Sequence, residues 1–202
     1  MFSKIASFGA VGALALGGMA VLATPAQAAP AAVKKKCAIG SWRLSGQATT
    51  NVAVVGGKKI VTKMSGGTGT KLKITTSTAS YDFSKSKPVW MVANTPNGVL
   101  KAKFTYRKTL KYAVKLTGGA KGTFTPKAKT ATGPATVRAV ILPDIDGGVQ
   151  RLAPQVRSGD DVFVVRVKAL SLCTKKTLTL SQKHGEPDGS TTTRKVIYRR
   201  TK

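Results

Sequence analysis

Hydrophobic and polar residues alternate along much of the chain, and the longest such run lies between Leu100 and Leu116. Its even positions are mainly aliphatic or aromatic, whereas most of its odd positions are lysine or arginine. A period of two, with one apolar face and one polar face, is typical of a β-strand. Lys108 alone breaks the pattern, so we predict a bulge, bend or turn between two strands at this residue.

Shorter alternating runs occur at residues 71–75, 121–127 and 177–180. Turn signals separate the runs, and these are Gly56-Gly57, Gly66-Gly67, Asn97-Gly98, Gly118-Gly119, Gly133-Pro134 and Pro187-Asp188-Gly189. Glycine and asparagine favour such turns because they tolerate a positive φ. No stretch carries a convincing helical repeat. Many short strands separated by turns predict an all-β protein, either an antiparallel sandwich or a barrel.

One segment, residues 142–161, lacks the alternation and holds four of the seven acidic residues. We predict that it is a long surface connection. Residues 149–156 are compatible with one short helical turn, although Pro154 excludes a long helix. The apolar run at residues 162–165 then predicts the start of a strand that leads to Cys173.

The N-terminus reads Met1-Phe-Ser-Lys4, continues with an apolar run over residues 5–23 and reaches an Ala-Gln-Ala sequence that ends at Ala28. This order is typical of a secretory signal peptide, and the alternative is a retained membrane anchor. We predict a signal peptide at residues 1–28, a basic Ala/Pro/Lys leader segment at 29–36, and one β-barrel domain at 37–202. We expect a secreted protein, extracellular or associated with the cell envelope, with no transmembrane span in the mature chain.

The chain has two cysteines, Cys37 and Cys173. Disulfides form and persist in the oxidising compartments outside the cytosol, so we predict that export allows these two residues to pair. The alternative is two separate free thiols.

The charge is strongly basic, because 34 lysines and arginines face only seven acidic residues, which gives a formal net charge of +27. Many of these cations share strand parity with polar positions, so we expect them on the outer face of the sheet. The predicted polyanion-binding residues are Lys71, Lys73, Lys101, Lys103, Arg107, Lys111, Lys115, Lys121 and Lys127. Candidate partners are wall phosphate polymers, acidic glycans, anionic lipid headgroups and extracellular nucleic acid. The alternative is a solvated surface that only aids solubility.

Several landmarks along residues 37–202 together resemble a known family. They are Cys37-Ala-Ile-Gly-Ser-Trp42, the GGTGTKL run at residues 66–72, Cys173 before Leu178-Thr179-Leu180, and Tyr198-Arg199-Arg200. In this order the chain resembles small secreted bacterial proteins of the lipocalin-like branch of the calycin superfamily. The resemblance implies a single-domain, antiparallel up-and-down β-barrel, which the predicted disulfide would close. It also implies that Trp42 closes the bottom of the barrel, with Arg199 or Arg200 packed across it.

The same resemblance implies a second function, which is to carry a small hydrophobic or amphipathic ligand inside the barrel. Four aromatic residues of the alternating strands are the candidate cavity lining, namely Phe104, Tyr106, Tyr112 and Phe124. Small barrels are often filled by their own side chains, so these residues are equally candidates for a packed core. Trp90 could face either way.

The sequence offers no catalytic constellation, metal site or cofactor site. The single histidine, His184, stands near Glu186 and Asp188 in a predicted hairpin turn, without the spacing of a closed zinc site. The glycine-rich stretch at residues 65–71 lacks the Gly-Lys-Ser/Thr ending of a phosphate-binding loop. We therefore expect a binding protein rather than an enzyme.

Overall fold

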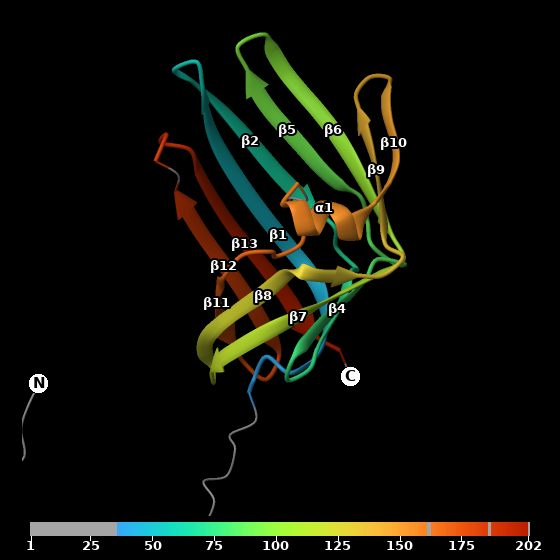
Figure 1. Cartoon of the computed structure of the whole chain (residues 1–202), viewed down its shortest axis with the longest axis vertical. Coiled ribbons are helices and arrows are strands. Elements are labelled where there is room, and N and C mark those ends of the chain that lie inside the picture. Colours follow the sequence, from blue (N-terminus) through green and yellow to red (C-terminus); the bar gives the residue numbers. More distant parts are fainter. Residues whose placement is uncertain (1–35, 161–162, 186, 202) are drawn as a thin grey trace, which may run out of the picture. The chain divides into compact units, whose positions relative to one another are not determined.

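The computed structural model describes residues 36–160, 163–185 and 187–201, which belong to one compact unit. The predicted signal peptide and all but Lys36 of the predicted leader lie outside the described residues. The described chain forms thirteen β-strands and one short helix (Figure 1). None of its helices has the length and apolar character needed to cross a bilayer.

The strands are β1 (Gly40–Val55), β2 (Lys58–Gly66), β3 (Lys71–Ile74), β4 (Thr78–Asp82), β5 (Val89–Thr95), β6 (Gly98–Arg107), β7 (Thr109–Gly118), β8 (Lys121–Thr132), β9 (Thr136–Ile141), β10 (Ile145–Arg151), β11 (Ala169–Cys173), β12 (Thr177–Gly185) and β13 (Thr191–Arg200). The helix α1 (Leu152–Ser158) connects β10 to β11. All strand pairs are antiparallel.

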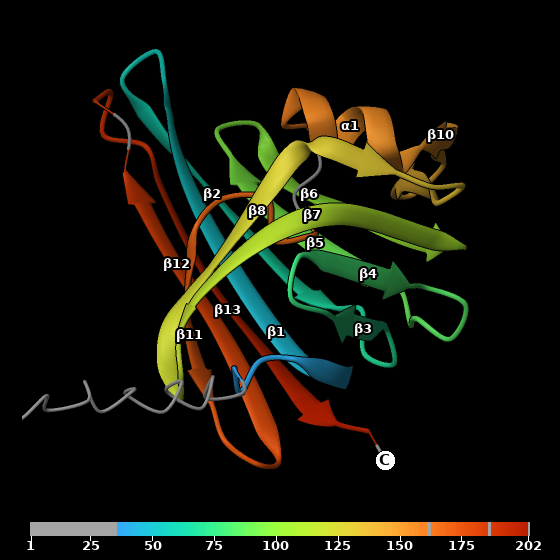
Figure 2. The same ribbon diagram turned by 60° about the horizontal axis from the view of Figure 1, so that its bottom comes forward.

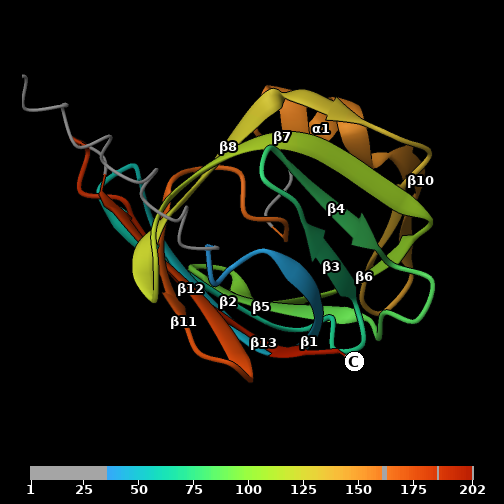
Figure 3. The same ribbon diagram turned by 90° about the horizontal axis from the view of Figure 1, so that it is seen from below.

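Eight of these strands close into a barrel. Their order is β1-β13-β12-β11-β8-β7-β4-β3, and the pairing of β3 with β1 completes the ring (Figure 3). The prediction of an antiparallel β-barrel is therefore confirmed. The predicted disulfide is also present and joins Cys37 to Cys173, which are 136 positions apart. In the chain-entropy model, a loop of this length contributes up to about 5 kcal/mol of stability.

The other five strands extend from β1 in the order β2-β5-β6-β9-β10. These five strands arise because four long strands bend, and each bend divides a long strand into two labelled strands. The first long strand is β2 followed by β3. Both of its parts pair with β1, because Ala48–Val55 pairs with β2 and Gly40–Arg43 pairs with β3. In the same way β4 continues into β5, β6 into β7, and β8 into β9. Each long strand thus contributes one part to the ring and the other part to an open sheet.

We call the ring the closed half, which comprises β3, β4, β7, β8, β11 and the adjoining parts of β1, β12 and β13. The open half comprises β2, β5, β6, β9, β10 and the remaining parts of β1, β12 and β13. Figure 2 shows the neighbours β3, β4 and β7 of the closed half, and Figure 1 shows the hairpins of the open half, which rise together at one end. The alternating pattern of the sequence did not indicate this division.

The bends lie side by side and require unusual backbone. Between β2 and β3, Gly66 and Gly69 have positive φ angles of 107° and 92°. A Cβ at Gly69 would lie 2.3 Å from the carbonyl oxygen of Lys85, in the next bend, so glycine is required there for space as well as conformation. Lys108, with φ 62°, forms the bend between β6 and β7, as the break in alternation predicted.

The closed half is filled by its own side chains. Inward positions such as Leu72, Leu110, Phe124 and Leu178 are almost wholly buried. At the level of the bends the core is aromatic, because Phe83 packs against Tyr106 and Tyr81 with ring centroids 5.4 Å and 5.9 Å apart.

Residues 163–165 form an internal plug rather than the start of the predicted strand, because β11 begins only at Ala169. Phe163, Val164 and Val165 are all buried, so these three consecutive side chains do not alternate between a buried and an exposed face as those of a surface strand would. Figure 3 shows this segment crossing inside the ring. The hydroxyl of Tyr112 donates to the carbonyl of Val165 at 2.8 Å, and Phe163 stacks on Tyr106 at 4.7 Å. The plug separates the packed closed half from the open half.

The predicted surface connection at residues 142–161 is more regular than expected. Its first part forms β10, which pairs with β9, and its second part forms α1. All residues of β10 are exposed, so this edge strand has no buried face and leaves no alternation in the sequence. Pro154 stands in the first turn of α1, where its missing N–H is not needed. Leu152 and Val156 lie on the buried face of α1.

Candidate binding surfaces

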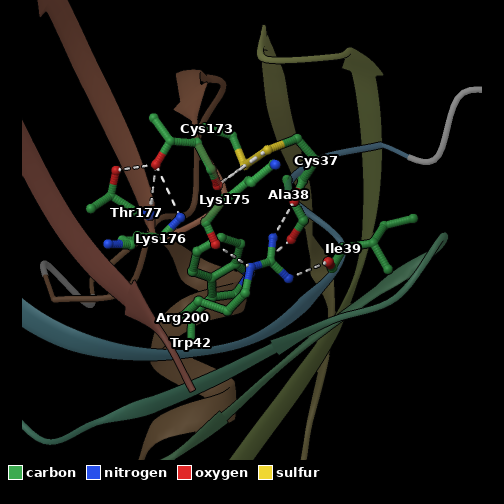
Figure 4. Close-up of a disulfide and its surroundings, with 10 residues drawn as sticks. Cys37, Ala38, Ile39, Trp42, Cys173, Lys175, Lys176, Thr177 and Arg200 are labelled. Carbon is green, nitrogen blue, oxygen red and sulfur yellow. Dashed lines mark hydrogen bonds between the residues drawn. A yellow bond between two sulfur atoms is a disulfide. The ribbon is translucent and has the colours of Figure 1, made fainter. Parts of the chain in front are cut away.

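The closed end of the barrel is sealed by Arg200, which lies over Trp42 with its guanidinium carbon 4.0 Å from the ring centroid (Figure 4). Trp42 is fully buried, and its indole N–H donates to the carbonyl of Ala38 at 2.9 Å. The guanidinium also donates to the carbonyls of Cys37, Ile39 and Lys175, at 2.8, 3.2 and 3.0 Å. Arg200 thus ties the first and last strands to the segment that carries the disulfide.

Of the two arginines named from the sequence, only Arg200 occupies this position. Arg199 pairs in register with Arg43 of β1. Consecutive residues of a strand point to opposite faces, so one of the two has to face outward. The sequence alone does not tell which arginine lies on the same face as Trp42, because this depends on the register between β13 and β1.

The four aromatic residues predicted as a cavity lining do not gather around one cavity. Tyr112 and Phe124 are buried in the packed closed half. Phe104 and Tyr106 belong to β6 in the open half, where they line a small cavity of about 180 Å³ beside α1. All four lie on strands of the sheet with their side chains buried or half-buried, but the bends assign them to different halves.

A larger cavity lies in the open half, above the plug, and sequence reasoning did not find it. It has a volume of about 300 Å³ and is lined by residues of β1, β2, β5, β12 and β13 together with residues 166 and 167. Met64 and Met91 supply apolar lining, while Arg166, Gln182 and Arg194 supply polar lining. The lining residues stand far apart in the sequence, so only the register of five strands brings them together.

The floor of this cavity carries a buried positive charge. The side chain of Arg194 donates from Nε to the hydroxyl of Thr49 at 3.1 Å and from Nη1 to the carbonyl of Val164 at 2.9 Å. Burial raises the pKa of Tyr81 and Tyr198 above the ordinary value for a phenol, and the Arg194 charge opposes part of that shift. The two tyrosines beneath the cavity therefore stay neutral up to and beyond the pH at which an ordinary phenol ionises.

His184 also lines this cavity, from the end of β12. Asp188 lies in the following turn, where its carboxylate accepts hydrogen bonds from the backbone N–H and hydroxyl of Ser190. Glu186 lies outside the described residues. In the described ranges, no group of three or more histidine, cysteine, aspartate or glutamate side chains is arranged to hold a metal ion.

The nine cations named from the alternation occupy the outer face. Eight are exposed and Lys103 is half-buried. They are spread over β3, β6, β7 and β8, so they cover parts of both halves. Cross-strand pairs place some of them in rows, since Lys73 pairs with Ser80 of β4, which in turn pairs with Lys111 of β7. These two lysines are therefore about 10 Å apart, twice the spacing of neighbouring strands.

Acidic groups do little to neutralise this surface. Between two described residues, one ion pair is present, and it joins Arg138 to Asp146 on β9 and β10. Asp82 lies opposite Lys71, and the backbone N–H of Ser84 lowers the pKa of this carboxyl. None of the nine cations takes part in that ion pair.

No protein-family model, curated protein or solved structure matches the chain. The resemblance to lipocalin-like proteins therefore stays a prediction that rests on the residues quoted above. The functional argument depends on the geometry and charge of this chain.

Proposed function

We propose that the protein is a secreted, non-enzymatic, lipocalin-like β-barrel binding protein whose polycationic outer surface associates with anionic polymers or cell-envelope surfaces. The observation that carries the proposal is the outward position of the nine cations across four strands. They belong to a chain with 34 basic and only seven acidic residues.

The spacing of these cations favours long polyanions over small anions. Rows such as Lys73 and Lys111 place ammonium groups about 10 Å apart. The Debye length at physiological ionic strength is about 8 Å, so the fields of neighbouring lysines overlap along the surface. A polymer with regularly spaced charges meets several of them at once, whereas a small anion meets one or two.

The type of cation favours general attraction. Eight of the nine residues are lysines, and a lysine ammonium acts as a point charge without the planar fork that arginine offers to phosphate or carboxylate. Wall phosphate polymers, acidic glycans, anionic lipid headgroups and extracellular nucleic acid all carry the required charge. The proposed association needs no cofactor.

A salt titration of the mature chain tests the proposal. Binding to a polyanion that displaces condensed counterions should weaken linearly on a plot of log affinity against log salt concentration. Replacing Lys71, Lys73, Lys111 and Lys115 together by glutamine should weaken binding and reduce the slope, without changing the fold. Binding that is insensitive to salt, or unaffected by the four substitutions, would contradict the proposal.

The cavity of the open half favours a second candidate function, the carriage of a small amphipathic ligand. The relevant observation is that Met64 and Met91 face a space of about 300 Å³ whose floor holds Arg194. Methionine adapts to irregular apolar ligands, and Thr49 and Gln182 add polar groups to the same lining, which together suit an amphipathic molecule. The ligand would therefore lie in the open half, above the plug, and not in the packed closed half.

Native mass spectrometry of the purified mature protein tests this second candidate. A co-purified small molecule that disappears in a Met91→Trp variant, which narrows the cavity, would support it. A protein of unliganded mass that takes up none of a panel of fatty acids or acidic isoprenoids would count against it.

A further inference from the structure

Two apolar side chains stand exposed on the outer face of β5, in the open half. Trp90 is 44% exposed and Val92 is 38% exposed. The residues that alternate with them, Val89, Met91 and Ala93, are buried or half-buried on the inner face. Trp90 and Val92 therefore form an outward apolar row in the middle of a sheet.

Lysines flank this row on both sides. On β2, Lys63 pairs with Val92, and on β6, Lys101 and Lys103 pair with Val92 and Trp90. Adjacent strands are about 4.8 Å apart, so the lysines of β2 and β6 stand about 10 Å from each other across the apolar row. Lys101 and Lys103 are about 7 Å apart along their strand. We call these five residues the Trp90 trough.

The indole of Trp90 is a partly covered platform rather than a projecting side chain. The ammonium of Lys103 lies over the ring, 5.7 Å from its centroid, and more than half of the residue's surface is covered. The other tryptophan differs, because Trp42 is wholly buried beneath Arg200 at 4.0 Å. Part of Trp90 thus remains exposed to a ligand, and the flexible lysine over its ring is free to turn toward an anionic group of that ligand.

We propose that the Trp90 trough binds a chain of acidic sugars, such as a polyuronate or a sulfated glycan. The C–H face of one sugar ring would stack on the negative face of the indole. The carboxylates or sulfates of that sugar and its neighbours would pair with Lys63, Lys101 and Lys103. The inference rests on the proposed function, to which it adds a short-range preference: all polyanions feel the general attraction, but only ring-bearing ones use Trp90.

Other polyanions fit the trough less well. Proteins that stack single-stranded nucleic acid use several aromatic platforms in succession, whereas Trp90 is the one exposed phenylalanine, tyrosine or tryptophan among the described residues. Insertion into a bilayer requires apolar groups that reach beyond the charges around them, and Trp90 and Val92 are more than half covered between lysines. Inorganic polyphosphate carries charge but has no ring to stack.

The test compares two probes on the mature full-length chain, polygalacturonate and linear inorganic polyphosphate, at equal charge concentration. The variants are Trp90→Ala, Trp90→Tyr, and Lys63, Lys101 and Lys103 together changed to glutamine. A triple variant of Lys71, Lys111 and Lys115 to glutamine makes the same change of charge in the closed half and serves as the control. Acrylamide quenching of fluorescence supplies a direct readout, since Trp42 is buried and quenching reports Trp90.

We expect Trp90→Ala to weaken polygalacturonate binding on the order of tenfold, the size of one lost stacking contact. Polyphosphate binding should change less than twofold, and Trp90→Tyr should retain most of the affinity. The trough triple variant should lose more polygalacturonate binding than the control triple variant. Polygalacturonate should protect Trp90 from acrylamide, and polyphosphate should not.

Different failures point to different conclusions. If the wild type binds both polymers but Trp90→Ala weakens both equally or neither, the trough inference is wrong while the general polyanion function stands. The same holds if vesicles of phosphatidylserine protect Trp90 and polygalacturonate does not, which would identify a lipid surface instead. If the wild type binds neither polymer, both the proposed function and this inference are wrong.

Discussion

Arg200 reaches across the closed end of the barrel to Trp42, and the same guanidinium donates to backbone carbonyls on both sides of the disulfide. The pair therefore joins three things at one point: the first strand, the last strand and the covalent link between Cys37 and Cys173. An arginine is suited to this position because its planar fork reaches several acceptors while its face covers an aromatic ring.

Replacing Arg200 by alanine should lower the free energy of unfolding by about 2 kcal/mol, because three hydrogen bonds to carbonyls and the contact with Trp42 are lost together. Urea unfolding of the oxidised protein measures this change. Arg199→Ala, which removes an exposed arginine on the opposite face, is the matched control and should change stability by less than about 0.5 kcal/mol. Equal effects of the two variants would contradict the role assigned to Arg200.

Replacing Gly69 by alanine should destabilise the fold by at least about 2 kcal/mol. The new Cβ would lie 2.3 Å from the carbonyl oxygen of Lys85 at a φ of +92°, so both space and backbone conformation oppose it. Gly119→Ala is the control, because a Cβ there meets no atom within 4 Å. Thermal unfolding should show a lower Tm for Gly69→Ala and not for Gly119→Ala. An unchanged Tm for Gly69→Ala would contradict the steric explanation of this bend.

Removing the disulfide by changing Cys37 and Cys173 together to serine should lower the free energy of unfolding by about 2 to 5 kcal/mol. The effect arises because the bond restricts the unfolded chain over 136 positions. Denaturant unfolding of the double variant and of the oxidised parent measures it. The parent should show no free thiol when it is unfolded without reductant, and two titratable thiols would contradict the pairing.

Stability should also fall at high pH. Burial raises the pKa of Tyr81 and, more strongly, that of Tyr198. Unfolded phenols ionise near about pH 10, so above this pH the unfolded state loses protons that the folded state keeps. The stabilisation is complete below about pH 10 and is lost as the pH rises further.

Phenolate absorbance should accordingly appear together with unfolding when the protein is titrated with base. A Tyr198→Phe variant removes the group whose pKa is raised most, so its stability should decline less steeply above about pH 10. Reversible ionisation of these phenols in a protein that keeps its native circular dichroism would show that they are accessible, against the burial described above.

The sequence predicted the fold class because its signals act over short distances. Parity along Leu100–Leu116 placed lysines outward and aromatic residues inward, and the structure has them so. Gly56-Gly57, Asn97-Gly98 and Gly118-Gly119 all lie at hairpin turns, although Gly98 and Gly118 are already the end residues of β6 and β7. The disulfide was predicted from the export signal together with the presence of only two cysteines.

The remaining features depend on register and could not be read from local patterns. Gly66-Gly67 and Gly133-Pro134 carry the same signal as the hairpin glycines, yet they are bends within long strands, because a positive φ serves both purposes. The Trp90 trough shows the same limit. Its three lysines and two apolar residues come from β2, β5 and β6, and only the pairing of those strands sets them beside one another.

The pairing of β1 with β13 governs the order in which the barrel can be assembled. Trp42–Val52 of β1 pairs with residues 191–200, so β1 finds this partner only after all the strands between them have been made. Contacts so far apart in sequence make folding slow, typically milliseconds to seconds for β-proteins. Until β13 emerges, one edge of β1 offers unpaired N–H and C=O groups, which are a template for association between chains. Truncation at the C-terminus should therefore yield aggregation rather than a smaller barrel, because it leaves that edge open permanently.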